Sequence, residues 1–396
     1  MINKVCVVTF LSVLVLATLA QAQSFTVLYN FTGQSDGATP WAGLIQDAAG
    51  DLDGTSQGAF VGAGNVYRMD TTGTETVLYT FTGSPDGAGP QAALTIDKAG
   101  NLYGTTVAGG GSGPLCGSCG TVFKIDTAGN ERVLYTFKGF SDGCLPTQGV
   151  IVDEAGDLFG TATQCGSSNL GTIFKLDTAG NFTLLHTFTG GSSDGAYPRW
   201  GHLTMDEAGN LYGLAQIGGS TGCTLGKGCG VLYKLSKNGK FALLYSFQGG
   251  LSDGCGPGGS LVQDKAGNSY GTTEGCGAGG TGTIWKLSKK GEETVLHNFA
   301  LSASNGCYPY AGVARDSKGN LYGVTYYCGA YSYGALYELS AKGVFTLLHS
   351  FDDYDGANPV GEVLRTAGGT LFGTATTGGT LGGDLSFFGT VWEYLP

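Results

Sequence analysis

Short runs of apolar and β-branched residues alternate with glycine-rich turns along most of the chain. In residues 76–81, 94–97, 101–106 and 120–125, apolar side chains occur on both alternating faces of the run. Runs of this length that are bounded by Asp, Asn and Gly are typical of β-strands, and two apolar faces are typical of sheets packed between other sheets. Glycine is the commonest residue, at 73, and helix signals are nearly absent. We therefore predict an all-β protein of many short strands.

These runs recur as one unit that is repeated seven times. An Asp-Gly pair marks each unit, with Asn in place of Asp in the sixth, and the marks lie 50–59 residues apart. The marks are Asp36, Asp86, Asp142, Asp194, Asp253, Asn305 and Asp355. Each unit offers four strands: A after a proline, B as in 101–106, C as in 120–125 and D as in 76–81. One unit cannot bury two apolar faces alone, but seven stacked radially can, so we predict a seven-bladed β-propeller with four antiparallel strands per blade.

The order of the strands also predicts how the ring closes. After the N-terminal leader the chain opens with a lone D strand, residues 25–31, and it ends on a C strand, residues 390–394. Pairing the two would complete the last blade and cover the exposed edges of the sheets. The alternative is an open solenoid, whose end repeats would need polar caps.

The repeat resembles a known family. The pattern S/D-G-x-x-P, then D-x-x-G-N-L-Y-G-T-T, then G-T-V-F-K-L resembles the tandem repeats of the GloVer family, bacterial exported proteins described as choice-of-anchor repeat proteins. The resemblance covers residues 25–396 and recurs seven times, with a departure at Asp53 in repeat 1. It implies an exported bacterial protein and assigns no activity to particular positions.

The N-terminus has the features of an export signal: Lys4, an apolar stretch over residues 5–19, and a small-x-small cleavage site in Ala20-Gln21-Ala22. We expect residues 1–22 to be a signal peptide and residues 23–396 to form one propeller domain that is secreted, periplasmic or associated with the cell surface. A transmembrane anchor is the alternative for the leader, and no later stretch is apolar enough to span a membrane. The net charge of −11 repels phosphate backbones, so we expect no nucleic-acid partner. We also expect a monomer.

Cysteine spacing predicts disulfide bonds. Ten of the 11 cysteines follow residue 22, and an even number in an exported chain favours disulfides. Three pairs, each 21 residues apart, recur at the same two places in repeats 3, 5 and 6, where strands A and B would bring them together; two more pairs lie in long loops. The predicted pairs are Cys144–Cys165, Cys255–Cys276, Cys307–Cys328, Cys116–Cys119 and Cys223–Cys229. Alternative roles for Cys116 and Cys119 are a redox dithiol or half of a zinc site.

Candidates for catalysis or metal binding are few. His186, His297 and His349 take the place of tyrosines in strand D, so we interpret them as packing residues. Residues 54–58 match G-x-S-x-G, but that motif needs a strand–turn–helix context, whereas these residues form a strand B. The repeated aspartates suggest calcium, yet each mark is followed by glycine in a turn that its own side chain can cap. We predict no metal site, no cofactor and no catalytic residue.

The position after the repeat proline varies most in an otherwise constant frame, which suggests that it specifies a ligand. Three positions after the proline most repeats have Gly, Ala or Ser, whereas repeat 7 has a glutamate, and repeat 4 has one extra residue in 199–202, which suggests a bulge. The candidate ligand-binding residues are Trp41, Arg199, Trp200, His202, Tyr310 and Glu362. Their alternative role is packing under loops and contact with water in the channel.

Two functions remain open at this point. The first is an exported, non-catalytic binding or scaffold propeller for an unknown extracellular ligand, a glycan or a protein. The second is a propeller enzyme that acts on carbohydrate as a hydrolase or a lyase. An enzyme would need several polar residues that converge at one mouth of the channel, whereas a binding protein needs a shaped, partly aromatic surface.

Overall fold

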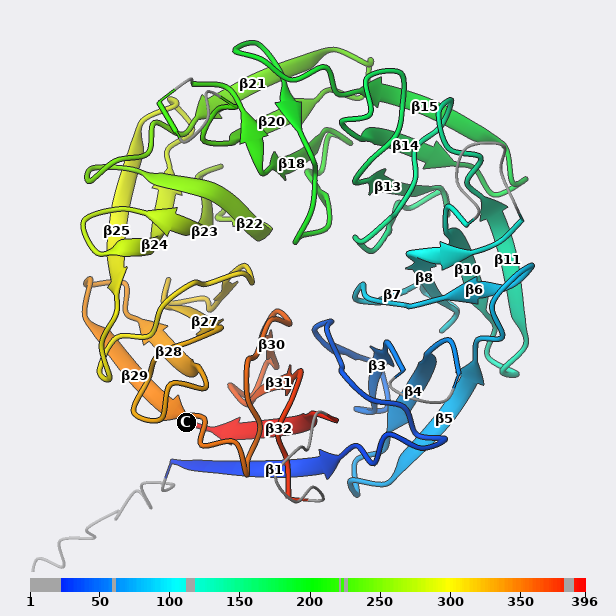
Figure 1. Ribbon diagram of the computed structural model, residues 1–396, viewed down its shortest axis with the longest axis horizontal. Helices are drawn as coiled ribbons and strands as arrows, with labels where there is room; N and C mark the ends of the chain where they lie inside the picture. The colour runs from blue at the N-terminus through cyan, green and yellow to red at the C-terminus, as the bar shows by residue number, and fades with distance from the viewer. Residues whose placement is uncertain (1–22, 59–61, 112–117, 221, 224–226, 381–387) are drawn as a thin grey trace, which may run out of the picture.

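Seven four-stranded antiparallel sheets surround a central axis, which confirms the predicted seven-bladed propeller (Figure 1). The computed structural model describes residues 23–58, 62–111, 118–220, 222–223, 227–380 and 388–396. The predicted signal peptide, residues 1–22, lies outside the described residues. In the described part, no helix is long and apolar enough to cross a membrane.

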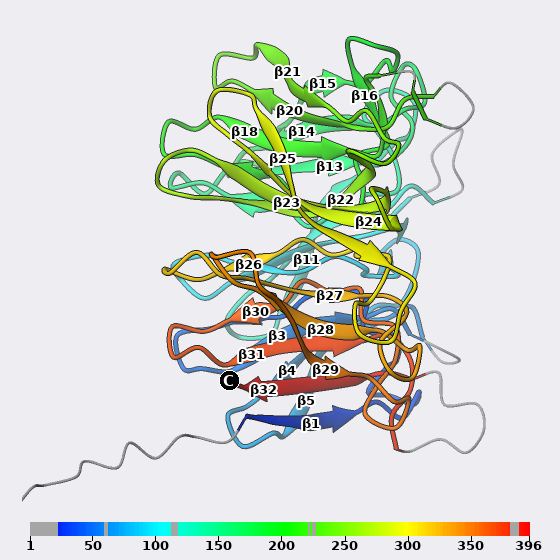
Figure 2. The ribbon, with the colours of Figure 1, turned by 90° about the vertical axis from the view of Figure 1, so that its left-hand side faces the viewer.

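The blades follow one another along the chain, each with its strands in the order A to D from the axis outward (Figures 1 and 2). Blade 1 contains β2 (Ile45–Gln46), β3 (Leu52–Ser56), β4 (Asn65–Met69) and β5 (Glu75–Thr80). Blade 2 contains β7 (Thr95–Ile96), β8 (Leu102–Thr106), β10 (Thr121–Ile125) and β11 (Glu131–Thr136). Blade 3 contains β12 (Ile151–Val152), β13 (Leu158–Ala162), β14 (Thr172–Leu176) and β15 (Phe182–Thr187). Blade 4 contains β17 (Thr204–Met205), β18 (Leu211–Ala215), β20 (Val231–Leu235) and β21 (Phe241–Ser246). Blade 5 contains β22 (Gly254–Gln263), β23 (Ser269–Cys276), β24 (Gly280–Leu287) and β25 (Glu293–Ala300). Blade 6 contains β26 (Ala314–Arg315), β27 (Leu321–Thr325), β28 (Ala335–Leu339) and β29 (Phe345–Ser350). Blade 7 contains β30 (Leu364–Arg365), β31 (Leu371–Ala375), β32 (Thr390–Leu395) and β1 (Ser24–Asn30).

Blade 7 closes the ring with the two ends of the described chain. Strand β1 pairs antiparallel with β32, in a register that runs from Phe25 opposite Tyr394 to Asn30 opposite Thr390. Figure 1 shows the two strands side by side at the edge of the ring, β1 outermost. The closure predicted from the strand order is therefore confirmed, and blade 7 has no unpaired outer edge on β32.

An aromatic pair locks every blade to the next. A phenylalanine at or just after the end of strand D packs against the aromatic residue in strand C of the following blade, with ring centroids 5.0–5.9 Å apart. The seven pairs are Phe31–Tyr67, Phe81–Phe123, Phe137–Phe174, Phe188–Tyr233, Phe247–Trp285, Phe299–Tyr337 and Phe351–Trp392. Strand B carries glycine beside each strand C ring; a Cβ at Gly104, for example, would overlap the ring of Phe123. The repeated Tyr-Gly-Thr sequence therefore reflects inter-blade packing as well as strand formation.

The innermost strands are shorter than the sequence suggests. Six blades pair only two residues of strand A with strand B, whereas β22 of blade 5 spans 10 residues. The backbone nearer the axis bonds across blades instead, because strand B threonines donate to carbonyls of the following blade. Thr105 Oγ1 donates to Gln148 O at 2.8 Å, and Thr374 Oγ1 donates to Ala42 O at 2.8 Å across the closure. These hydrogen bonds between neighbouring blades therefore fix the position of the inner segments that line the channel.

Four of the five predicted disulfides are present among the described residues: Cys144–Cys165, Cys223–Cys229, Cys255–Cys276 and Cys307–Cys328, with Cα–Cα distances of 5.1–5.5 Å. The fifth predicted pair includes Cys116, which lies outside the described residues. Two repeats without cysteine at the places equivalent to Cys144 and Cys165 make the same contact as a small two-stranded sheet: β6 (Gly87–Ala88) with β9 (Ala108–Gly109), and β16 (Gly195–Ala196) with β19 (Ile217–Gly218). Cysteine therefore reinforces a contact that the repeat already makes.

Candidate functional site

The repeat proline fixes where each blade presents its most variable side chain. In all seven blades the residue before the proline has a positive φ, and its N–H donates to a carbonyl of the preceding blade. In blade 4, Tyr197 has a φ of 54° and donates to Leu170 O at 2.8 Å; in blade 6, Tyr308 has a φ of 58° and donates to Thr281 O at 2.9 Å. This inter-blade bond anchors the turn, so the residue after the proline begins at a fixed place near the channel.

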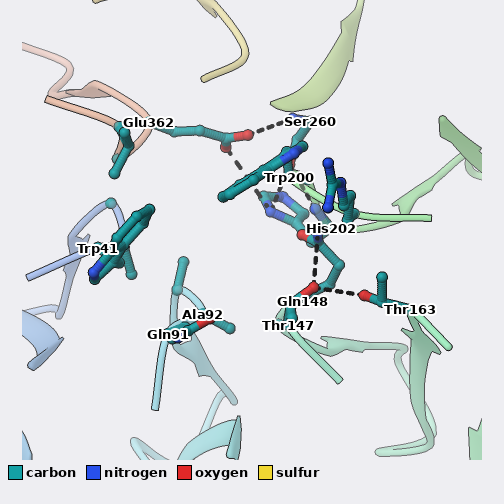
Figure 3. Close-up of a pocket in the computed structure, with 18 of the residues that line it drawn as sticks. Trp41, Gln91, Ala92, Thr147, Gln148, Thr163, Trp200, His202, Ser260 and Glu362 are labelled. Atoms are coloured by element: carbon teal, nitrogen blue, oxygen red, sulfur yellow. Dashed lines mark hydrogen bonds and ion pairs between the residues drawn. The ribbon is translucent and has the colours of Figure 1, made fainter. Parts of the chain in front are cut away.

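All six predicted ligand-binding residues line two adjoining cavities around the axis. Figure 3 shows the first of them, with Trp41, Trp200, His202 and Glu362 labelled. The first, about 180 Å³, receives side chains from six blades, including Gln148, His202 and Glu362. The second, about 510 Å³, extends over blades 5 and 6 and includes Tyr310 and Glu274. Trp41, Arg199 and Trp200 line both cavities. The residues that break the repeat are therefore neighbours in space, although repeats far apart in sequence supply them.

Three of these residues form an aromatic wall between the cavities. The rings of Trp41 and Trp200 have centroids 6.2 Å apart and planes inclined by 21°, and Trp200 lies 5.8 Å from Tyr310. The extra residue of repeat 4 is absorbed at Trp200, which has a φ of 74°. That conformation is rare for a bulky side chain, and it replaces the predicted bulge, because paired strand begins again only at Thr204. Backbone strain of this kind is typical of functional sites.

Two polar groups on this wall are buried without a partner. The guanidinium of Arg199 lies over the Trp200 ring, 5.2 Å from its centroid. Arg199 Nε and Trp200 Nε1 are buried and make no hydrogen bond within the described residues. An unsatisfied buried donor costs about 1–3 kcal/mol, so both atoms lower the stability of the protein.

His202, Ser260 and Glu362 form a network across the channel (Figure 3). The His202 backbone N–H donates to Ser260 Oγ at 2.8 Å, and the same Oγ lies 2.8 Å from His202 Nδ1. Glu362 accepts a hydrogen bond from the Ser260 N–H, and its Oε2 lies 3.9 Å from His202 Nδ1. Serine and carboxylate thus face the same imidazole nitrogen, whereas a serine–histidine–acid triad places them on opposite nitrogens. The three side chains therefore orient one another in a geometry that differs from such a triad.

Sequence reasoning missed a second variable position, three residues after the strand B glycine. Glu274 and Tyr326 occupy it in blades 5 and 6, and both line the larger cavity. Burial raises the pKa of the Glu274 carboxyl, while a hydrogen bond from Gln216 Nε2 to Oε1 (2.7 Å) and the charge of Arg199 oppose the increase. A comparison of this position across repeats could have found them, since it varies beside the position after the proline: Gln57, Val107, Thr163, Gln216, Glu274, Tyr326 and Thr376.

The repeat aspartates have structural partners. Asp36 accepts hydrogen bonds from the Tyr29 hydroxyl (3.0 Å) and from the Thr32 N–H (2.7 Å), and it thereby caps the end of strand D. His186 replaces the tyrosine in blade 3 and bonds Asp194 at 3.2 Å. Among the described residues, the one group of three potential metal ligands with neighbouring ligand atoms is formed by cysteines that are in disulfides.

The fold and these cavities define a seven-bladed β-propeller with an aromatic site at its channel. The chain belongs to the Gloeobacter/Verrucomicrobia repeat family, whose model matches residues 14–151 and 222–392. A comparison with curated proteins finds no match.

Solved structures share the fold at low identity. The chain is similar to the extracellular domain of a putative hybrid two-component system from B. thetaiotaomicron, with a TM-score of 0.59 and 14% identity. The match covers 95% of this chain and 41% of that one. A gluconolactonase from Xanthomonas campestris (TM-score 0.43, 14% identity, 90% and 96% covered) and an aldose sugar dehydrogenase from Streptomyces coelicolor (TM-score 0.45, 15% identity, 94% and 98% covered) also match. Similarity at this level describes the fold alone.

Proposed function

We propose that this propeller is an exported, non-catalytic binding protein whose ligand is a carbohydrate held at the aromatic wall. The observation that carries the proposal is that three aromatic side chains, Trp41, Trp200 and Tyr310, line the same cavities as Arg199 and Glu274. A sugar ring has apolar C–H faces that pack on aromatic rings and hydroxyl groups that accept and donate hydrogen bonds. The site offers both kinds of contact.

Export is supported by the disulfides. Four bridges form among the described residues, and disulfides persist in oxidising compartments outside the cytoplasm. The disulfide bonds also lie close to the candidate site, since Cys255 lines the larger cavity. A ligand met outside the cytoplasm is consistent with an extracellular glycan.

The proposal is tested by screening the purified protein on a glycan array and by titrating each positive glycan in a calorimeter. Trp200→Ala and Arg199→Gln should each weaken binding by about tenfold or more, because central aromatic and arginine contacts carry most of the energy of an interface. Phe140→Ala is the matched control, since Phe140 is 54% exposed and lies outside both cavities. If no glycan binds, or if both site variants bind as the parent does at unchanged melting temperature, the proposal is wrong.

The second candidate, a carbohydrate-active enzyme, is favoured by one observation, the 2.8 Å contact between Ser260 Oγ and His202 Nδ1. Incubation of the protein with each bound glycan, followed by chromatography of the products, decides between the two. Intact glycan is expected. Cleavage that Ser260→Ala abolishes would instead assign a catalytic function.

A further inference from the structure

The aromatic wall continues out of the channel as a track over blade 6. Six rings follow one another with centroids 4.4–6.3 Å apart, starting at the axis and ending in the segment before Pro309, beside the loop after β27. Their order is Trp41, Trp200, Tyr310, Tyr326, Tyr327 and Tyr308. Residues 326–333 alone contain four tyrosines, and no other repeat has such a run.

The outer part of the track faces solvent. Tyr327 is 46% exposed, and Tyr331 and Tyr333 on the same loop are 59% and 39% exposed. Clustered exposed aromatic residues are typical of interaction sites, whereas single ones are common on any surface. The cluster is also held in place, because Cys328 is bonded to Cys307 and the side chain of Asn358 donates to Tyr326 O at 3.1 Å. A pre-ordered surface loses less entropy when a ligand binds.

Two side chains, Glu362 and His202, extend into the channel at the inner end of the track. Glu362 of blade 7 reaches past Gly312 to the Ser260 N–H of blade 5. Glu362 and His202 line the channel cavity and also the next cavity along the axis, of about 310 Å³, so they stand between the two. A chain that follows the track would meet these two side chains at the axis.

We infer that the ligand is the end of a linear, uncharged polysaccharide, with its terminal unit in the channel cavities and the following units along the blade 6 tyrosines. The inference rests on the proposed function and deepens it. Hydroxyl groups of a terminal sugar match both the guanidinium of Arg199, which donates hydrogen bonds, and the carboxyl group of Glu274, which accepts them, and both residues line the larger cavity. A proline-rich peptide also packs on aromatic tracks, but proline offers carbonyl acceptors only. The net charge of −11 disfavours a polyanionic chain.

The length dependence of binding tests the track. The probes are β-1,4-linked gluco-, xylo- and manno-oligosaccharides and α-1,4-linked gluco-oligosaccharides of one to six units, titrated calorimetrically into the full chain. For the series that binds, affinity should rise about tenfold from two to six units. Tyr327→Ala with Tyr331→Ala, at two exposed residues outside both cavities, should remove that rise while the disaccharide binds as before. Tyr354→Ala is the control, because Tyr354 is 73% exposed and outside the track.

Three results would overturn the inference in distinguishable ways. Binding that does not depend on length, or a length effect that survives the double tyrosine variant, refutes the track and leaves the proposed function standing. Failure of every oligosaccharide to bind refutes both. Binding of a ten-residue proline peptide in their place, lost in the double tyrosine variant, assigns the track to a peptide.

The stoichiometry tests recognition of a chain end. A bound series is extended to a soluble polymer of the same linkage, and the number of proteins per polymer chain is measured by sedimentation. Recognition of a chain end gives one protein per polymer molecule whatever its length. Several proteins on one polymer would show internal binding and would refute recognition of a chain end.

Discussion

Three glutamates at blade interfaces replace an aromatic residue that the other blades use. Glu75, Glu131 and Glu293 occupy the start of strand D, opposite the last residue of strand C, where the other four blades have phenylalanine. The phenylalanines are Phe25, Phe182, Phe241 and Phe345. In the Phe blades the ring stacks on the tyrosine or histidine of the preceding blade; Phe182 lies 4.4 Å from Tyr135, with the planes inclined by 16°. We predict that Glu131→Phe stabilises the protein and reduces its sensitivity to pH.

The surroundings of Glu131 give the physical reason. Its Oε1 is buried without a hydrogen-bond partner, and its neighbours on the preceding blade are Tyr79 and Asp86. Burial, together with the charge of Asp86, raises the pKa of Glu131 from an ordinary 4.5 to about 7, against the effect of a hydrogen bond with Tyr79. The native state therefore binds this proton more tightly than the unfolded chain does between these two pH values.

The sign and size of the expected change in stability follow from proton linkage. Because the folded protein holds the extra proton, stability falls as the pH rises from about 4.5 and the loss is complete above about 7. The carboxyl is partly open to solvent, which screens its interactions, so we estimate a loss of about 1–2 kcal/mol at pH 8. Glu131→Phe removes this loss and adds a stacked pair worth about 0.5–1.5 kcal/mol. We expect a gain of about 2 kcal/mol at pH 8 and about 1 kcal/mol at pH 5.

The assay is urea unfolding of parent and variant at pH 5 and pH 8, followed by tryptophan fluorescence. Glu154→Gln is the control, because Glu154 is exposed in the turn between β12 and β13 and should change neither midpoint. The reverse variant, Phe182→Glu, should lose stability, and more so at pH 8. If Glu131→Phe changes both midpoints equally or lowers the one at pH 8, the charge at this interface is not the cause of the pH dependence.

Three further predictions concern the fold. Deletion of residues 23–31 removes β1 and should lower the melting temperature of the entire ring, and an unchanged single transition would contradict closure by that strand. Peptide mapping without reduction should recover Cys144 linked to Cys165, and replacing both by alanine should cost about 3 kcal/mol in the loop-entropy account; a free thiol at either position in the parent would refute the pair. Gly104→Ala should cost about 1–3 kcal/mol because its Cβ would overlap Phe123, and wild-type stability would show that the ring can move away.

Repetition made the fold predictable, and it also limited what could be predicted of the site. Seven copies of one pattern determined the blades, the closure and the equivalent places of Cys144 and Cys165 in other repeats. The left-handed conformation of Trp200 could not be foreseen, since an inserted residue can be absorbed as a bulge or as a turn. Glu274 was missed because it lies near the end of strand B, beyond the repeated pattern. The distance between that end of the strand and the proline turn depends on how the inner segments bond across blades.

The asymmetry of the channel explains why the aromatic wall lies where it does. Glycines of three successive blades meet at the axis: a Cβ on Gly201 would overlap the backbone of Gly259, and a Cβ on Gly259 would overlap that of Gly312. Backbones this close leave no space for side chains between blades 4, 5 and 6. The neighbouring side chains, Trp200 and Tyr310, therefore line the cavities, and their ring centroids lie 5.8 Å apart. The same close approach that narrows the channel on one side thus builds the surface that we propose binds the ligand.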